Sequence, residues 1–269
     1  MSQNFIIDKT NNKFYSKSYK RIISLVPSIT ELLFSFGLEN YIIGVTKYCI
    51  HPPEAQKKTI IGGTKNPNIE LIKNLQPDLV LINKEENQKK HYDLLLKEKI
   101  LVFVVYPQTV DEAFEMIQDL MKLLNISNDQ SHQDIINLEN IISKIKGNSV
   151  SKYEKNKPRV FCPIWKQPWM TINKETFIHS LIEFCGGKNI FAEKKERYPQ
   201  ITMDEIKQSN PNIVLLPDEP YKFETEDKVE LEKEFKEVLL IDGTFHWYSF
   251  RMIWSLQLLF ELFSKEKIT

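Results

Sequence analysis

Short apolar runs rich in β-branched residues alternate along the chain with amphipathic stretches whose apolar positions recur every three or four residues. The first series of candidate strands and helices reads RIISLV, SITELLFSFG, YIIGVT, IELIKNL, DLVLI, KKHYDLLLKEK, ILVFVVY and VDEAFEMIQDLMKLLN. A second series reads RVFCPIW, ETFIHSLIEFCGG, NPNIVLLP and SFRMIWSLQLLFELF. This alternation is typical of parallel sheets covered by helices on both faces.

Between the two series, QSHQDIINLENIISKIK has helical periodicity and no strand partner, and a polar break, GNSVSKYEKNKP, follows it. We therefore predict an α/β fold of two Rossmann-like lobes with parallel sheets, over residues 20–124 and 157–263. A single long backbone helix over residues 128–147 joins them. Ligands of such sheets bind beyond the carboxyl ends of the strands, so we expect a binding cleft between the lobes.

One helix–turn–strand unit occurs twice. The segments Ile69–Ile82 (IELIKNLQPDLVLI) and Met203–Leu216 (MDEIKQSNPNIVLL) align at an offset of 134 positions. The aligned pairs are Ile72/Ile206, Lys73/Lys207, Pro77/Pro211, Val80/Val214 and Leu81/Leu215. Two copies this far apart are too few for a solenoid, which needs several adjacent repeats, and fit two lobes that contain the same unit.

The charge, cysteine content and apolar runs of the chain limit the functions that we expect. The 269 residues include 36 basic and 36 acidic side chains that interleave without a basic stripe, so nucleic acid is not an expected partner. Three distant cysteines, Cys49, Cys162 and Cys185, give no disulfide framework and read as small buried hydrophobes. No apolar run has the length of a signal peptide or membrane span, so the chain as written is expected in the cytoplasm.

Candidate chemistry follows the strands. After RVFCPI, the loop WKQPWM contains Trp165 and Trp169, which we interpret as the wall of a pocket because large indoles in loops usually cover something. DGTFHWYSFRM adds His246, Trp247 and Arg251, although Trp247 could equally fill its own lobe's core. After DLVLI, the residues Lys84, Glu85 and Glu86 are either a functional rim or a solvated loop, and the sequence favours the loop.

Five motifs together resemble a known family: PSITELLFSFG, YIIGVTKYCIHPP, GGTKNPNIELIKNLQPDLVLI, CGGKNIF and RYPQITMDEIKQSNPNIVLLP. They are similar to the helical-backbone (class III) substrate-binding proteins of ABC importers, which include cobalamin-binding and iron-siderophore-binding proteins. The resemblance runs from Lys20 to Phe263 and is strongest to the cobalamin branch. That branch often has an aromatic residue where this chain has Thr64, Lys65 and Asn66.

The resemblance implies a rigid, monomeric two-lobed receptor that is not an enzyme. It implies a cobalamin-like corrinoid or a ferric-siderophore-type metal chelate as a ligand that is not covalently bound. Residues at matching positions of the cleft are Tyr48, Lys65, Trp165, Trp169, Tyr198, Trp247 and Arg251.

The resemblance also implies a partner, the membrane permease dimer of an ABC importer. Glu70 and Asp204 match the acidic residue that each lobe presents to arginines of the permease, and two like-placed carboxylates suit a two-fold symmetric partner. This role requires a periplasmic or cell-surface location, reached if an export signal was removed.

Three alternatives remain. An enzyme is not supported, because no nucleophile elbow, dinucleotide fingerprint or P-loop is present among the 8 glycines. A receptor for a bare transition-metal ion could use Cys49, His51, Glu85, Glu86 and His246, although their spacing forms no recognisable ligand motif. A cytoplasmic cofactor-binding protein could have kept the same fold, in which case Glu70 and Asp204 would have no arginines to dock on.

Overall fold

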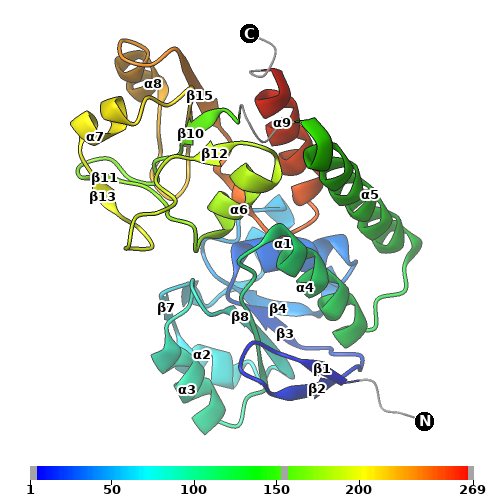
Figure 1. Cartoon of the computed structure of the whole chain (residues 1–269). Helices are drawn as coiled ribbons and strands as arrows, with labels where there is room; N and C mark the ends of the chain where they lie inside the picture. The colour runs from blue at the N-terminus through cyan, green and yellow to red at the C-terminus, as the bar shows by residue number, and fades with distance from the viewer. Residues whose placement is uncertain (1–4, 153–156, 266–269) are drawn as a thin grey trace. The chain divides into compact units, whose positions relative to one another are not determined.

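The chain forms two compact units in a computed structural model that describes residues 5–152 and 157–265 (Figure 1). The first unit contains the chain up to Pro107, Ala113–Ile136 and the short segment Tyr248–Phe250. The second contains Gln108–Glu112, Asn137–Trp247 and the residues from Arg251 on. Each unit has one parallel sheet with connecting helices, so the predicted α/β fold class is confirmed.

The first unit is built on a five-stranded sheet in the order β5–β4–β3–β8–β9, and each neighbouring pair is parallel. Its strands are β3 (Ile22–Ser24), β4 (Ile42–Val45), β5 (Thr59–Ile60), β8 (Leu79–Asn83) and β9 (Val102–Val105). The connecting helices are α1 (Pro27–Ser35), η1 (Glu39–Tyr41), η2 (Pro53–Lys57), α2 (Ile69–Asn74) and α3 (Lys89–Lys97). Strands β8 and β9 are buried at every position, as expected for parallel strands covered on both faces.

Two short hairpins of the first unit were not predicted from the sequence. They are β1 (Phe5–Ile7) with β2 (Lys13–Tyr15), and β6 (Gly62–Gly63) with β7 (Asn66–Pro67). The turn of the N-terminal hairpin is joined to the edge strand β9, because the Lys9 amide donates to the Val104 carbonyl at 3.0 Å. Strands of two or three residues carry too little periodicity to be recognised in a polar sequence.

The second unit has a four-stranded parallel sheet in the order β12–β10–β14–β15 and a two-stranded antiparallel sheet of β11 and β13. The strands are β10 (Arg159–Phe161), β11 (Trp169–Met170), β12 (Lys188–Asn189), β13 (Gln200–Ile201), β14 (Ile213–Pro217) and β15 (Glu237–Ile241). The helices are α6 (Phe177–Phe184), α7 (Met203–Gln208), α8 (Thr225–Leu231), η3 (Gly243–His246) and α9 (Met252–Lys265). Strand β15 was not predicted, because it directly follows a highly charged stretch.

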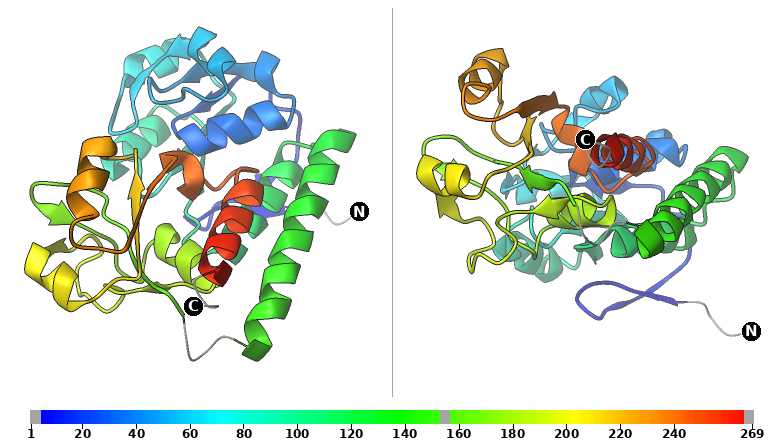
Figure 2. Two further views of the ribbon diagram at one scale, coloured as in Figure 1. Left: turned by 90° about the horizontal axis from the view of Figure 1, so that it is seen from above. Right: turned by 45° about the horizontal axis from the view of Figure 1, so that its top comes forward.

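The helices α4 (Val110–Leu123) and α5 (Asp129–Lys152) each contain residues of both units. Figure 2 shows α5 as one continuous helix, and the division between the units falls within it at Ile136/Asn137. The helix continues past the predicted end at residue 147 to Lys152, so the first residues of the expected polar break are helical. The remainder of that break includes residues 153–156, which lie outside the described residues.

The sequence repeat is also a structural repeat. Helices α2 and α7 and strands β8 and β14 have the same lengths and correspond residue for residue at the offset of 134 positions. Each helix begins with a side-chain cap: Asn68 accepts from the Leu71 amide at 3.0 Å, and Thr202 accepts from the Glu205 amide at 3.2 Å. The matching residues Gln76 (φ 46°) and Asn210 (φ 42°) then adopt the left-handed conformation in the turn before the strand.

An arginine closes the turn in each unit. The Arg21 Nε donates to the Gln76 carbonyl at 3.0 Å, and the Arg159 Nε donates to the Ser209 carbonyl at the same distance. The backbone amides of these arginines also donate, to Asp78 (3.0 Å) and Asn212 (2.8 Å) respectively. Arg21 immediately precedes β3 and Arg159 is the first residue of β10, so these bonds fix the end of the short helix against the start of the sheet.

The repeated helix and strand also contribute to the same place in each core. Ile72 and Val80 belong to the apolar cluster of the first unit, and Ile206 and Val214 belong to that of the second. The three cysteines are free and buried, as predicted. Within the described residues, no helix combines the length and apolarity needed to cross a bilayer.

We expect Arg159→Met to lower the free energy of unfolding by about 1–3 kcal/mol, because the last carbonyls of α7 would lose charge-assisted hydrogen bonds. The more exposed Arg21 should give a smaller loss in Arg21→Met. Urea denaturation would measure both. The control is Lys188→Met, because the described residues offer the exposed Lys188 side chain no hydrogen bond or ion pair. Equal stability of Arg159→Met and Lys188→Met would contradict the role of the arginine.

Candidate functional site

Strand order locates the candidate ligand-binding edge of each unit. In the first unit, β3 lies between β4 and β8, and in the second, β10 lies between β12 and β14. The connections from such a central strand run to opposite sides of the sheet, which leaves a crevice beyond its carboxyl end. The residues that follow β8, β10 and β14 are therefore the ones to consider for binding.

In the first unit, two asparagines organise the loop after β8. The Asn83 side-chain oxygen accepts the amides of Glu85 (2.7 Å) and Glu86 (3.2 Å), and its nitrogen donates to the Tyr248 hydroxyl at 2.7 Å. Asn87 accepts from the Asn83 amide at 2.8 Å and donates to the Thr64 carbonyl at 2.9 Å. Both asparagine side chains are buried and hydrogen-bonded at both ends, so this loop is a fixed platform with few free donors of its own.

Tyr248 extends this network. Its hydroxyl donates to the Glu86 carboxylate, and burial, followed by the negative charge of Glu86, raises the pKa of Tyr248 well above its ordinary value. The hydroxyl therefore remains protonated at physiological pH. The next residue, Ser249, donates to the Glu31 carboxylate at 2.8 Å, which joins this segment of the chain to α1. The sequence favoured a solvated loop for Glu86, but in the structure this glutamate has a specific partner, the hydroxyl of Tyr248.

Two predicted ligand contacts of the first unit lie close to this platform. Tyr48 is 52% exposed, and its ring lies against Gly63, where a Cβ atom would come within 3.2 Å of the ring. The exposed Lys65 ammonium donates to the Glu85 carbonyl at 2.6 Å. Tyr48 therefore presents an aromatic face to solvent, and Lys65 presents a positive charge whose position is set by the loop after β8.

In the second unit, an aromatic cluster follows β10. Trp169 stacks on Phe223 with a centroid distance of 6.0 Å and an interplanar angle of 7°, and it packs against the core of this unit. Trp165 is 43% exposed and meets Tyr221 edge-to-face at 5.3 Å. The two indoles thus differ: Trp169 mainly anchors the loop, and Trp165 offers exposed aromatic surface.

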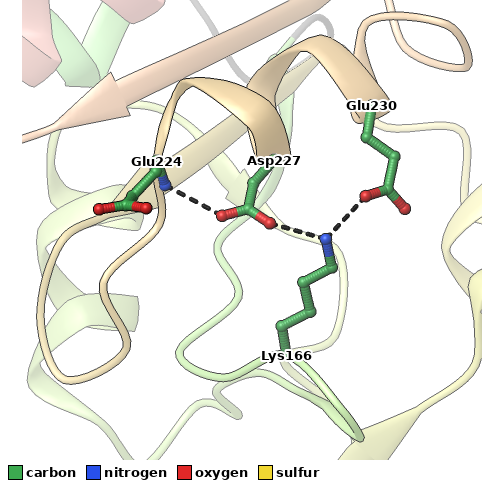
Figure 3. A network of polar contacts seen from close by, with 4 residues as sticks. All are labelled: Lys166, Glu224, Asp227 and Glu230. Carbon is green, nitrogen blue, oxygen red and sulfur yellow. Dashed lines mark hydrogen bonds and ion pairs between the residues drawn. The ribbon is translucent and has the colours of Figure 1, made fainter.

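Lys166, between these two tryptophans, fixes the loop to α8 (Figure 3). Its ammonium contacts the carboxylates of Asp227 (2.6 Å) and Glu230 (2.7 Å), and the second Asp227 oxygen accepts the Glu224 amide at 3.0 Å. Partial burial opposes ionisation of Asp227, but the hydrogen bonds from Lys166 and the Glu224 amide hold the pKa of this carboxyl below its ordinary value. The ion pair is mostly shielded from solvent, with side chains only 14% and 13% exposed.

A charged group follows β14 and β15. The Asp218 carboxylate accepts the Gly243 amide at 2.5 Å, and Arg251 donates to the Thr244 hydroxyl at 3.1 Å. Burial raises the pKa of Glu219, and the nearby carboxylates raise it further, against the lowering effects of Trp247 and Arg251. This edge of the sheet is therefore more acidic than the platform of the first unit.

Three further predicted ligand contacts belong to the second unit. Trp247 is 5% exposed, with the Arg251 guanidinium 5.6 Å from its ring centroid, which favours the alternative that this indole is mainly a packing residue. Arg251 is half-buried. Tyr198 is 38% exposed in the second unit, and Arg197 lies over its ring at 5.8 Å. A ligand role for these three residues stays a prediction.

The predicted docking carboxylates, Glu70 and Asp204, are exposed in the first turns of α2 and α7. Neither forms an ion pair with any residue that the structure describes, whereas the neighbouring Glu205 closes a capping box with Thr202. The helix ends therefore do not depend on Glu70 or Asp204 for a cap. Their docking role stays a prediction.

The residues suggested for a bare metal ion lie in both units: His51, Glu85 and Glu86 in the first, and His246 in the second. Across the described ranges, no group of three or more His, Cys, Asp and Glu side chains is arranged to hold a metal ion. The buried Cys49 accepts a hydrogen bond from Thr30 at 3.1 Å, and burial raises the pKa of its thiol. A thiol kept neutral in this way is a poor metal ligand.

Sequence reasoning missed four residues that position these surfaces: Asn83, Asn87, Lys166 and Tyr221. The sequence does show Lys166 between two loop tryptophans, and it shows Asn83 and Asn87 on either side of two glutamates. The partners of these side chains, however, are distant in sequence. Asn83 and Tyr248 are 165 residues apart, and Lys166 and Asp227 are 61 apart. Only the folded chain identifies such pairs.

Comparison with known proteins shows which family the chain belongs to. A family described as periplasmic binding protein matches residues 22–238. A vitamin B12-binding protein of Yersinia pestis is 28% identical over 204 residues, which is 75% of this chain and 70% of that protein.

Solved structures share the fold over nearly the whole chain. The periplasmic vitamin B12-binding protein of Vibrio cholerae has a TM-score of 0.79 at 19% identity, over 93% of this chain and 99% of that one. A possible iron-binding (periplasmic solute-binding) protein of Staphylococcus epidermidis has a TM-score of 0.72 at 25% identity, over 91% and 98%. A periplasmic heme-binding protein of Roseiflexus has a TM-score of 0.74 at 18% identity, over 93% and 99%.

We expect Asp227→Asn to lower the free energy of unfolding at pH 7 by about 1–2 kcal/mol, because Lys166 loses a charged acceptor in a partly buried place. Since the folded-state pKa of Asp227 is lowered, its contribution is complete above the unfolded-state pKa of about 3.9 and is lost as the pH falls through the folded-state value. The difference between variant and parent should therefore shrink below about pH 4.

The matched control for this experiment is Glu230→Gln, because the Glu230 side chain is 56% exposed and its pairing with Lys166 is screened by water. Chemical denaturation of both variants from pH 7 to pH 3 gives the comparison. A difference for Asp227→Asn that stays constant over this range would contradict the electrostatic account.

Proposed function

Because the chain belongs to the periplasmic binding protein family, we propose that it is the substrate-binding protein of an ABC importer for a corrinoid or a similar metal chelate. The ligand is bound reversibly for transport and is not a resident cofactor. The relatives at 25–28% identity support this ligand class, since one is a vitamin B12-binding protein and another a possible iron-binding protein. The family consists of binding proteins, and we propose no catalysis.

The observation that carries the proposal is Trp165, an exposed indole held by a rigid loop at the carboxyl edge of a parallel sheet. Edge-to-face contact with Tyr221 orients its ring, and the ion pairs of Lys166 fix the loop to α8. A tetrapyrrole-like ligand has a broad apolar face, and stacking it on a ring that is already ordered costs little conformational entropy.

The first unit, taken by itself, also offers groups that suit such a ligand. Tyr48 offers a second exposed ring, and Lys65 offers a cation on the loop that Asn87 fixes through the Thr64 carbonyl. A positive charge suits the carboxylates, phosphate or amide oxygens that surround the metal-binding ring of such chelates. In contrast to a receptor for a bare metal ion, this arrangement supplies aromatic surface and hydrogen-bond donors and not a set of metal ligands.

We propose that Glu70 and Asp204 dock on the membrane subunits of the importer, at its extracytoplasmic face. Their equivalent positions on the repeated helix support a two-fold symmetric partner. Exposure without an ion pair to any described residue leaves both carboxylates available to arginines. A cytoplasmic cofactor carrier is the alternative, and it predicts no effect of these residues on any transporter.

Titration with cyanocobalamin should quench the intrinsic tryptophan fluorescence, because the corrin ring would stack beside Trp165. We expect Trp165→Ala to weaken binding at least tenfold, equivalent to about 1.4 kcal/mol. Trp254→Phe is the control: Trp254 is 41% exposed on α9, so its replacement should leave affinity unchanged. A ferric siderophore titrated in parallel distinguishes the two ligand classes.

If neither chelate changes the emission of the folded protein, the proposed ligand class is wrong. If a chelate binds and Trp165→Ala has the affinity of the parent, the ligand class stands and the assignment of the stacking residue is wrong. Calorimetric titration should accompany the fluorescence, since corrinoids absorb at the wavelengths used.

Charge reversal tests the partner. We expect Glu70→Arg and Asp204→Arg to fold normally and bind the chelate with parental affinity, because exposed rim charges mainly affect docking. ATP hydrolysis and uptake by the importer reconstituted in proteoliposomes should fall, most strongly in the double variant. Glu115→Arg and Glu196→Arg are matched controls, since both glutamates are exposed and lie outside the repeated helices.

Unchanged uptake in the double variant would refute the docking role and favour the cytoplasmic carrier. Lower stability with unchanged uptake would instead indicate that the two acids only interact with the dipoles of their own helices.

A further inference from the structure

A cavity lies in the first unit, between the N-terminal hairpin, the loop after β8 and α3. Its volume is about 270 Å³, near the lower end of the roughly 300–1,000 Å³ of small-molecule sites. Its apolar walls come from Ile82 at the end of β8, Val104 in β9 and the ring of Tyr92 in α3. Three lysines also line it: Lys9, Lys84 and Lys89.

One wall of this cavity comes from the turn of the N-terminal hairpin, which contributes Lys9 and Thr10. The hairpin β1–β2 precedes residues 22–238, the part of the chain that matches the family. Its turn is held rigidly, because the buried Asp8 carboxylate accepts the amides of Thr10 (2.9 Å) and Val104 (3.1 Å). The Tyr92 hydroxyl meets the Asn12 side chain at 3.3 Å, which joins this turn to α3.

The lining carries an excess of positive charge. Lys89 pairs with Asp93, but neither Lys9 nor Lys84 forms an ion pair with any described residue. The buried Asp8 carboxylate accepts the amides of Thr10, Asn12 and Val104 and forms no ion pair with a lysine that the structure describes. Lys89 and Lys90 also open α3 without an acid in its first turn or a side-chain cap, so cations stand at the positive end of the helix dipole.

Exposed lysines and apolar walls in one cavity suit a ligand that combines a negative charge with an apolar body. We propose that this cavity is a second binding site, for a small organic anion with an apolar body, such as an aryl or alkyl carboxylate. The anionic group is held by Lys9 and Lys84, and the body lies against Ile82, Tyr92 and Val104. The ligand is too small to be the transported chelate, and the site does not depend on the proposed transport function.

The probe is 4-fluorophenylacetate, followed by fluorine NMR on the full chain, with the neutral 4-fluorophenylacetamide and inorganic phosphate as comparisons. We expect the carboxylate to bind with a dissociation constant below about 1 mM (about −4 kcal/mol) and the amide at least tenfold more weakly. Phosphate alone should bind weakly, because it has no apolar body. Backbone amide signals of Thr10, Gln88 and Val104 should shift on titration.

The double variant Lys9→Met/Lys84→Met should bind the carboxylate at least tenfold more weakly. Lys90→Met removes one positive charge from α3 outside the cavity lining, so it should stay within twofold of the parent. Thermal unfolding checks that all variants are folded. Absence of carboxylate binding to the folded parent would overturn the proposal, as would equal affinities in the double variant and Lys90→Met, or phosphate binding more tightly than the carboxylate.

Discussion

The turn between the short helix and the central strand is the constraint on which both units depend. It places a non-glycine residue, Gln76 or Asn210, in the left-handed conformation, which is unfavourable by itself. Arg21 and Arg159 offset this cost by binding the last carbonyls of α2 and α7. Arg21 is next to β3 and Arg159 begins β10, so each arginine joins the helix end and the turn to a central strand. The neighbouring strand, β8 or β14, follows the turn directly and is fixed with them.

From this common geometry the two units derive different surfaces. In the first, the loop after β8 is closed by buried asparagines and by Tyr248, so its polar groups are already satisfied and serve as support. In the second, Trp165 stays exposed because Trp169 and Lys166 take over the anchoring of its loop. The binding surface that we propose at Trp165 is ordered before a ligand arrives, which limits the entropy lost on binding.

Charge acts locally in this protein. The net charge of the chain is zero, but its charged side chains have different local roles. Lys166 and Asp227 form an ion pair that is shielded from solvent, and Glu70 and Asp204 are exposed on the repeated helices. Lys9 and Lys84 line a cavity and have no acidic partner among the described residues. The Lys166–Asp227 ion pair contributes to the stability of its loop, whereas the exposed carboxylates and lysines contribute little to the stability of the fold. Charges that stabilise nothing within the chain are the natural candidates for recognition of a partner or an anion.

The α/β class and the repeated helix–turn–strand unit could be predicted, because periodicity and turn residues act over a few neighbouring positions. Trp165 could be singled out as a large indole in a loop after a strand, and the family resemblance added the paired acids Glu70 and Asp204. Strand β15 and the N-terminal hairpin were missed, since short strands beside charged residues carry no local signal. Only the tertiary structure separated Trp169, which stacks on Phe223, from the exposed Trp165, and joined Asn83 to Tyr248. Burial and hydrogen bonding of such side chains depend on partners tens to hundreds of positions away, which no local pattern contains.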